Sequence, residues 1–253
     1  MNDDNRRMSR IIIVVPCYNE AGRMDAGQFS RLQVEGHRVE LLLVNDGSAD
    51  GTLVMLERLR SEQPDRITVL DLGRNSGKAE AVRRGIATAM AAAPDYVGFW
   101  DADLATPFAE LPGFVRVLEG DPELQMVFGA RVKLLGRVID RRPQRHYLGR
   151  VAATLISNTL GISIYDSQCG AKLFRMSETL REVFREPFLS RWIFDVEIIA
   201  RFISIWGRDA TALRIYELPL RQWKDVQGSK ITGGDFLKAL GDLWRIRKTY
   251  RRQ

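Results

Sequence analysis

The chain has 253 residues, of which 45% are hydrophobic and 28% are charged, and its formal net charge is +6. This balance is typical of a globular protein with its own core, and it excludes the disordered and fibrous classes. Two cysteines, Cys17 and Cys169, cannot form a disulfide framework, which fits a reducing compartment.

The N-terminal half alternates between strand-like and helix-like segments. Short apolar runs rich in β-branched residues predict strands at Ile11–Val15, Val39–Asn45, Ile67–Leu72, Tyr96–Trp100 and Gln125–Ala130. Apolar residues at helical spacing predict helices at Gly51–Ser61, Gly77–Met90 and Pro107–Leu118. Apolar strands that alternate with helices indicate an α/β fold, with a Rossmann-like, mostly parallel sheet flanked by helices.

The alternation becomes less regular after residue 150. Helices are predicted at Val151–Leu160 and Phe194–Trp206, and a strand is predicted at Ala212–Leu218. A polar loop spans residues 221–234 and precedes a C-terminal helix, whose predicted apolar face contains Phe236, Leu240, Leu243 and Trp244. The apolar face of this helix could simply pack on the domain.

No linker, low-complexity tract or internal repeat divides the sequence. We interpret residues 1–253 as one domain, with a nucleotide-binding half at about 9–130, an acceptor-binding half at about 131–232 and a basic amphipathic helix at about 233–253. The polar N-terminus does not resemble a signal peptide, and no apolar run reaches the roughly 20 residues of a membrane span. We expect a cytoplasmic protein, soluble or peripheral on the membrane.

Positive charge is concentrated in two segments. Residues 131–150 hold seven basic residues and one acidic residue, and residues 245–253 hold five basic residues and no acidic one. Such patches favour anionic partners, namely phosphates, acidic lipid surfaces or nucleic acid. Because no aromatic and basic RNA-binding motif is present, we do not expect nucleic acid as a partner. The basic end of the C-terminal helix could rest on an anionic membrane surface.

Polar clusters follow three of the predicted strands, at Pro16–Glu20, Asn45–Ser48 and Asp101–Asp103. Ligands of open α/β sheets bind at the carboxyl ends of the strands, so these loops are expected to converge on one site. A further motif, Asn75–Lys78, opens a predicted helix. Backbone amides at a helix start, together with a lysine, favour an anion there.

Asp101 and Asp103 are the candidate metal ligands. Two carboxylates two residues apart can reach one divalent cation, and oxygen ligands together with substrate phosphates suit Mg²⁺ or Mn²⁺. Such a cation would neutralise a departing diphosphate. The alternative is that both aspartates only form a turn before the helix at Pro107. Asp46 could bind a base or ribose, or cap a helix, and the ring of Tyr18 could stack on a nucleobase.

The order of these motifs resembles that of the family 2 glycosyltransferases with the GT-A fold. The motifs of the first half are VVPCYNE (14–20), VNDGS (44–48), NSGK (75–78) and DAD (101–103). The motifs of the second half are GAR (129–131), DSQCGAK (166–172), FDVE (194–197) and WKDVQGSK (223–230). The second set is similar to the dolichyl-phosphate glucosyltransferases and their bacterial polyprenyl-phosphate relatives. The resemblance spans about residues 11–231.

The resemblance implies roles for these positions. The residues implied to bind the donor are Pro16, Tyr18, Glu20, Asp46, Lys78, Ala102, Ser229 and Lys230, the last two in a loop that closes over it. Asp101 and Asp103 are implied to serve the metal and the diphosphate, with Asp103 as the primary ligand. Arg131 and Arg150 are implied to bind the phosphate of the acceptor. Related mannosyl enzymes often have glutamine as an extra metal ligand where this chain has Ala105.

The implied reaction moves a hexose, glucose in these relatives, from a UDP-sugar to a polyprenyl or dolichyl phosphate with inversion. A phosphate monoester has a second pKa of about 6, so it is already an anionic nucleophile at neutral pH. It needs arginines to position it rather than a base. Asp166 could orient such arginines or approach the metal. Asp195 could cap its helix or face the site as a base, and Glu197 is expected to pair with Arg201.

Alternative functions remain open. A family 2 enzyme with a saccharide hydroxyl as acceptor would need a general base, for which Asp195 is the candidate. GDP-mannose could replace the UDP-sugar as donor. A nucleotidyltransferase could share the sheet and the metal carboxylates, but it would release pyrophosphate from a nucleoside triphosphate.

Overall fold

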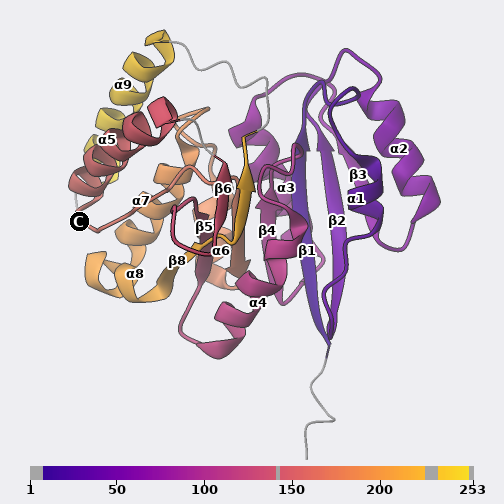
Figure 1. Cartoon of the computed structure of the whole chain (residues 1–253), viewed down its shortest axis with the longest axis horizontal. Coiled ribbons are helices and arrows are strands. Elements are labelled where there is room, and N and C mark those ends of the chain that lie inside the picture. The colour runs from indigo at the N-terminus through magenta and orange to yellow at the C-terminus, as the bar shows by residue number, and fades with distance from the viewer. Residues whose placement is uncertain (1–7, 141–142, 226–232, 251–253) are drawn as a thin grey trace, which may run out of the picture.

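The computed structural model describes residues 8–140, 143–225 and 233–250. Its main feature is a seven-stranded sheet with the strand order β3-β2-β1-β4-β7-β5-β8 (Figure 1). The strands are β1 (Ser9–Cys17), β2 (His37–Asn45), β3 (Ile67–Asp71), β4 (Tyr96–Trp100), β5 (Met126–Ala130), β7 (Ala171–Arg175) and β8 (Ile215–Pro219). All neighbours are parallel except β7, which is antiparallel to both β4 and β5.

Both faces of the sheet are covered by helices, which explains why its strands are apolar throughout. In β1, Ile11 and Ile13 face one hydrophobic core, and Ile12 and Val14 face the other. Successive side chains of a strand point to opposite faces, so a strand buried on both sides cannot alternate with polar residues. The five strands predicted for the N-terminal half are confirmed, and the bounds of β4 agree with the prediction.

The helices fall into two layers. One face carries α1 (Ala26–Ser30), α2 (Thr52–Glu62) and α4 (Leu111–Gly120), the last preceded by a 3-10 turn at Phe108–Glu110. The other face carries α3 (Lys78–Ala91), α5 (Pro143–Leu160), α6 (Glu178–Arg185), α7 (Phe194–Trp206) and α9 (Gly233–Tyr250). A short helix, α8 (Arg208–Arg214), joins α7 to β8. Among the described residues, no helix is long and apolar enough to cross a membrane.

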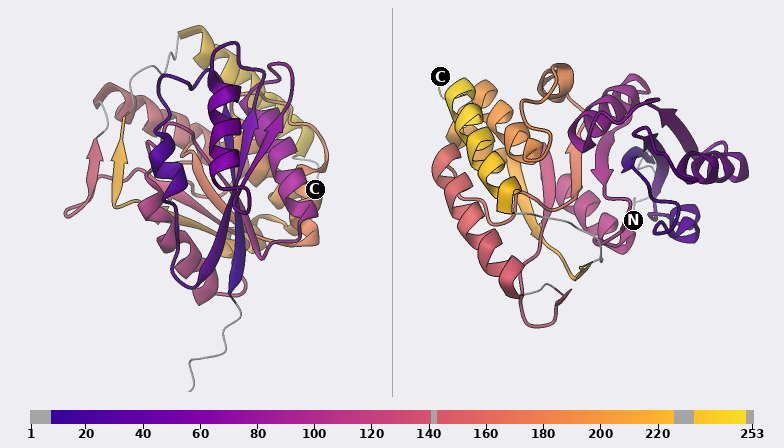
Figure 2. Two further views of the ribbon diagram at one scale, coloured as in Figure 1. Left: turned by 90° about the vertical axis from the view of Figure 1, so that its right-hand side faces the viewer. Right: turned by 90° about the horizontal axis from the view of Figure 1, so that it is seen from above.

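A second, two-stranded sheet lies beside the main one. It pairs β6 (Val138–Asp140) with β9 (Gln222–Lys224) in parallel, and it projects to one side of the molecule (Figure 2, left). The backbone N–H of Lys224 donates to the carbonyl of Ala105, 3.0 Å away. This contact ties the small sheet to the loop that follows β4.

The second half of the chain differs from the prediction in several places. The strands β6 and β7 and the helix α6 were not predicted, and α5 begins at Pro143 instead of Val151. The segment Ala212–Leu218, predicted as a strand, contains the end of α8 and only the first part of β8. The segment 221–234, predicted as a loop, contains the short strand β9 and the first residues of α9.

The predicted apolar face of the C-terminal helix is also wrong in part. Leu243 and Ile246 are buried against the rest of the protein, whereas Trp244 is 62% exposed and Leu240 is 38% exposed. The helix therefore has an inner face that packs on the domain and an outer face that presents apolar side chains to solvent. The side chain of Phe236 lies outside the described residues.

Candidate active site

The polar loops predicted to converge do lie at one edge of the sheet. β2, β1 and β4 are neighbours, and the last residues of β1 and β2, Cys17 and Asn45, are paired. Because β7 runs the opposite way, it begins at the edge where its neighbours end, with Ala171 opposite Trp100. Residues 166–170, which we call the β7 leading loop, therefore enter between the ends of β4 and β5.

The loop after β1 interlocks with the loop after β2. Asn19 makes both contacts. Its backbone N–H donates to Ser48 Oγ (3.1 Å), and its side-chain oxygen accepts from the N–H of Ala49 (2.9 Å). Asn19 adopts a left-handed conformation with φ of 53°. Tyr18, which follows the β1 residues Pro16 and Cys17, is 46% exposed. Its ring is thus accessible for stacking, and its nucleobase-binding role remains a prediction.

Glu20 is buried and held by an arginine. Arg23 donates to both carboxylate oxygens of Glu20, at 3.0 and 2.6 Å. The hydrogen bond that Arg23 donates to Glu20 raises the pKa of Arg23, and the charge of Asp103 adds to this effect. The loop after β1 is therefore electrostatically coupled to the loop after β4.

Asp46 is buried at the start of α3. Its two carboxylate oxygens accept from the backbone N–H groups of Ser76 (2.7 Å) and Gly77 (2.9 Å). Gly47 must be glycine, because a Cβ there would lie 2.3 Å from the carbonyl carbon of Arg74. Asp46 thus stabilises the turn that opens α3, where the helix dipole favours a negative charge. Its predicted contact with a nucleoside is not tested by this geometry.

Asp101 and Asp103 extend from the end of β4, on either side of the buried Ala102. The ammonium of Lys78 lies 2.5 Å from Asp101 Oδ1. Asp103 Oδ1 accepts from the N–H of Ala105 (3.0 Å), so the alternative turn interpretation holds for that contact. Burial raises the pKa of Asp103, and the charge of Asp101 raises it further.

Lys78 connects α3 to these carboxylates. Partial burial of the Lys78 side chain, which is 43% exposed, would lower its pKa, but the negative charges of Asp101, Asp195 and Asp103 outweigh this effect and raise it. The lysine therefore stays protonated among three carboxylates. Within the described parts of the chain, no group of three or more histidine, cysteine, aspartate or glutamate residues is arranged to hold a metal ion.

Arg131 follows β5 directly and is held by Asp166. Arg131 Nε and Nη2 donate to the two oxygens of Asp166, each at 2.6 Å, and the backbone N–H of Arg131 donates to the same carboxylate at 3.0 Å. Burial alone would lower the pKa of Arg131, but Asp166 raises it, so the guanidinium stays charged. The predicted orientation of an arginine by Asp166 is thus present in the structure.

The β7 leading loop is fixed from the side of β8. Glu217 accepts from the backbone N–H groups of Tyr165 (2.8 Å) and Asp166 (2.8 Å). Arg150 packs its guanidinium on the ring of Tyr165, 3.8 Å from the ring centre, and donates to the Tyr165 carbonyl (3.0 Å). Both predicted acceptor arginines therefore contact the segment that carries Asp166. Ser229 and Lys230, the remaining donor candidates, lie outside the described residues.

Asp195 does not cap α7, so this alternative was wrong. The capping position is Ile193, which makes no side-chain hydrogen bond to the helix start. Asp195 is buried in the first turn, where its Oδ1 lies 2.5 Å from the ammonium of Lys172. The predicted pair of Glu197 and Arg201 is confirmed at 2.8 Å.

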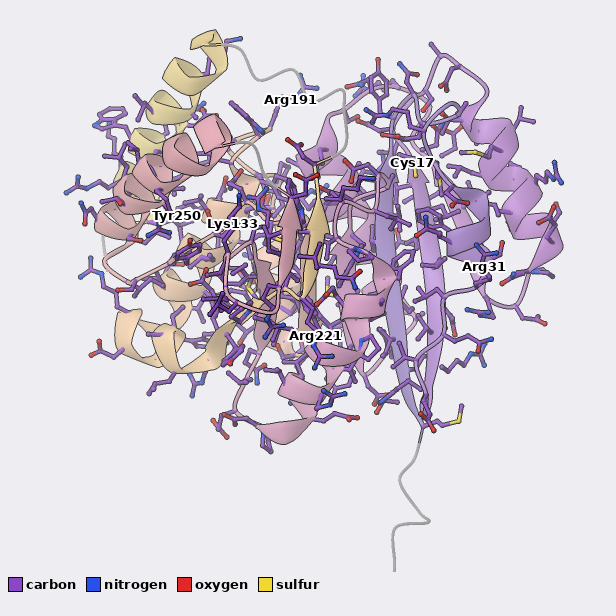
Figure 3. The ribbon with its side chains drawn as sticks, in the orientation of Figure 1. Cys17, Arg31, Lys133, Arg191, Arg221 and Tyr250 are labelled. Atoms are coloured by element: carbon purple, nitrogen blue, oxygen red, sulfur yellow. The ribbon has the colours of Figure 1, made fainter. Side chains whose placement is uncertain are left out.

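Two charged residues near the site were missed by the sequence analysis. Lys172 was quoted only as part of a motif, and its burial could not be inferred without the partner Asp195. Arg191 lies at the same end of the molecule as Cys17 (Figure 3). Its side chain covers the start of α3, where a Cβ on Gly77 would lie 2.8 Å from Arg191 Nε. An exposed arginine before an apolar helix gave no distinctive signal.

Comparison with known proteins identifies the family. The model of Glycosyl transferase family 2 matches residues 12–180. The chain belongs to glycosyltransferase family 2. Among the relatives of this glycosyltransferase, the dolichyl-phosphate beta-glucosyltransferase of Saccharomyces cerevisiae is 32% identical over 94% of this chain and 74% of the yeast protein. The enzyme of the same name from Homo sapiens is 28% identical over 95% of this chain and 79% of its own.

Solved structures of similar shape confirm the GT-A fold of this glycosyltransferase. Glucosyl-3-phosphoglycerate synthase from Mycobacterium tuberculosis, in complex with Mn²⁺, UDP-glucose and phosphoglyceric acid, has a TM-score of 0.65 at 20% identity, covering 95% of this chain and 80% of that chain. The mannosyltransferase PcManGT from Pyrobaculum calidifontis, in complex with GDP-Man and Mn²⁺, has a TM-score of 0.62 at 20% identity. The match covers 98% of this chain and 65% of that chain.

Proposed function

We propose that this glycosyltransferase transfers glucose from UDP-glucose to the phosphate of a polyprenyl phosphate of the dolichyl phosphate type, with inversion at the anomeric carbon. The names of its relatives support the donor sugar and the acceptor. The observation that carries the proposal is Arg131, held by two hydrogen bonds to Asp166 at the same sheet edge as Asp101 and Asp103. This arrangement offers one position for an acceptor anion beside another for a leaving diphosphate.

The acceptor phosphate needs a cation and not a base. Arg131 uses Nε and Nη2 for Asp166 and lies over the ring of Trp223, so we assign its third nitrogen, Nη1, to the acceptor phosphate. A guanidinium fixed on one side is preorganised, so little side-chain entropy is lost when a phosphate binds on the other. Arg150, on the ring of Tyr165, is the second arginine that we assign to the acceptor.

Asp101 and Asp103 are the residues that would hold Mg²⁺ or Mn²⁺. Asp101 Oδ1 is shielded from solvent and already lies 2.5 Å from the ammonium of Lys78, so the residues present accept a positive charge at this position. Two carboxylates suit an ion whose other ligands come from substrate phosphates. When bound, the ion stabilises the negative charge of the leaving diphosphate. Lys78 would add a second positive charge on the same side.

The geometry disfavours a hydroxyl acceptor. That alternative needs a general base, and its candidate was Asp195. The carboxylate of Asp195 is buried and paired with Lys172 at 2.5 Å, so it serves as the counter-ion of that lysine rather than as a free base. An already ionised phosphate makes such a base unnecessary.

Substituting Arg131 tests the acceptor assignment. Arg131→Lys keeps the charge but loses the two-pronged contact with Asp166, so we expect the KM for a short polyprenyl phosphate to rise about 10- to 100-fold. The KM for UDP-glucose should change little. The measurement is transfer of radiolabelled glucose to the lipid phosphate at varied concentrations of each substrate.

The control for this experiment is Arg58→Lys on the exposed surface of α2, which should leave both KM values unchanged. Transfer to a saccharide but to no lipid phosphate would refute the acceptor class. A KM for UDP-glucose that rises with the acceptor KM in Arg131→Lys would place this arginine at the donor instead.

We further propose that α9 rests on an anionic membrane surface while the enzyme works on a lipid-linked acceptor. Its outer face presents Trp244 and Leu240, one helical turn apart, beside the exposed Arg247 and Lys248. Apolar side chains flanked by basic residues favour the interface of an anionic bilayer.

Removing the two apolar side chains tests this membrane contact. The double variant Leu240→Ser, Trp244→Ser should weaken binding to vesicles of mixed zwitterionic and anionic lipid about tenfold or more, because both groups would lose burial in the interface. Sedimentation with vesicles measures the bound fraction. Val54→Ser, on exposed α2, is the matched control and should bind as the native protein does. Equal binding by both variants would show that the outer face of α9 does not contact the membrane.

A further inference from the structure

Lys172 is a fully buried lysine near the start of β7, with 0% of its surface exposed. Lysine is almost never fully buried unless its charge is paired. The ammonium lies 2.5 Å from Asp195 Oδ1, and it donates to the backbone carbonyls of Ser167 (3.1 Å) and Cys169 (2.6 Å). These three partners match the three donors of an ammonium group.

The two carbonyls that Lys172 holds belong to the β7 leading loop. The first residue of this loop, Asp166, binds the guanidinium of Arg131. The last residue, Gly170, lies against Asp101: the carbonyl of Gly170 accepts from the Asp101 N–H at 3.0 Å, and a Cβ on Gly170 would lie 1.9 Å from Asp101 Oδ2. One short loop therefore contacts both the candidate metal ligand and the candidate acceptor arginine.

We propose that Lys172, with Asp195 as its counter-ion, is a positioning residue that holds the β7 leading loop so that Asp101 and Arg131 keep their separation. What these two residues bind rests on the proposed function. The role of Lys172 rests on its own contacts, which are with Asp195 and the β7 leading loop rather than with Asp101 or Arg131.

The buried charge of Lys172 is explained by the position of the β7 leading loop rather than by the stability of the fold. Two phenylalanine rings, Phe99 and Phe128, lie 5.1 and 5.8 Å from the ammonium, so the surroundings are otherwise apolar. An apolar pair of similar size often serves as well as a buried ion pair for stability. Such a pair could not donate to the carbonyls of Ser167 and Cys169. Without the lysine, no ammonium would hold the β7 leading loop through these two carbonyls.

The test compares two variants that each remove one charge from a buried ion pair whose acidic member lies on α7. Lys172→Met should raise the Mn²⁺ concentration for half-saturation about tenfold in the presence of UDP, because outer-shell partners affect metal affinity by that order. It should also raise the KM for the acceptor phosphate. Glu197→Gln removes a charge from the pair with Arg201; Glu197 shares the first turn of α7 with Asp195, but its partners are Leu189, Arg201 and Tyr250 rather than the β7 leading loop. It should lower Tm but leave Mn²⁺ binding within about twofold.

Free Mn²⁺ is measured by its electron paramagnetic resonance signal, which needs no turnover. Unchanged Mn²⁺ binding in Lys172→Met, or an equal loss in Glu197→Gln, would overturn the proposal. If Lys172→Met does not fold, the double variant Lys172→Met, Asp195→Leu removes both charges and is read in the same way. Wild-type protein that binds Mn²⁺ and UDP but transfers no glucose to lipid phosphate would refute the proposed function, and leave the comparison of the variants intact.

Discussion

Asp103→Asn is expected to lower the rate of glucose transfer by about three orders of magnitude, the largest effect of any single change in this chain. Asp103 is the primary candidate ligand of the divalent cation, and Asn keeps its shape while it removes the charge. Burial and the charge of Asp101 raise the pKa of Asp103, so the pair of carboxylates repel each other without a cation. Asp103→Asn therefore removes one of the two carboxylates that would bind the cation.

The measurement is kcat with radiolabelled UDP-glucose, with and without a chelator. Chelation should abolish the activity of the native enzyme, and added Mn²⁺ or Mg²⁺ should restore it. In Asp103→Asn, added metal should restore little. The control is Asp209→Asn on the exposed α8, which should keep full activity. Turnover by Asp103→Asn within a few-fold of native would contradict the assignment of the metal site.

Gly170→Ala should lower kcat about 100-fold, although it adds only one methyl group. The new Cβ would lie 1.9 Å from Asp101 Oδ2 and 2.2 Å from its carboxylate carbon, so Asp101 or the backbone of the loop must move. A displacement of about 1 Å at a reacting centre can cost 100-fold in rate. Overpacking of this kind also costs about 1–3 kcal/mol of stability.

Gly22→Ala is the matched control for this substitution. It lies in the loop after β1, and no atom lies within 4 Å of its added Cβ. The two variants are compared by kcat at saturating substrate and by Tm. Native kcat in Gly170→Ala would show that Asp101 tolerates a different position, and would remove the basis for the close packing of the β7 leading loop.

The first half of the fold could be predicted because its strands are buried on both faces. β4, with the sequence YVGFW, has no polar residue to obscure the pattern, and its bounds were found without error. The convergence of the loops after β1, β2 and β4 followed from the rule that parallel strands share a carboxyl edge. The same rule places Tyr18, Asp46 and Asp101 at one edge of the sheet from the sequence alone.

The second half could not be predicted in the same way, because its elements depend on distant partners. β7 carries Lys172 in the middle of a short apolar run, and that lysine is tolerated only because Asp195 and two carbonyls surround it. The strand predicted at Ala212–Leu218 began inside α8, since a seven-residue helix is too short to establish a period. The contacts of Arg191 with the start of α3 likewise join residues that are far apart in the sequence.

The reversed direction of β7 has a consequence for how the protein is made. β5 pairs only with β7 and β8, and both of these are synthesised after it. A nascent chain that has left the ribosome as far as residue 130 can assemble β1 to β4, but β5 must wait about another 45 residues for β7 and about 90 for β8. Fragments cut near residue 130 should therefore aggregate when expressed alone, and recover solubility when the complementary fragment is co-expressed.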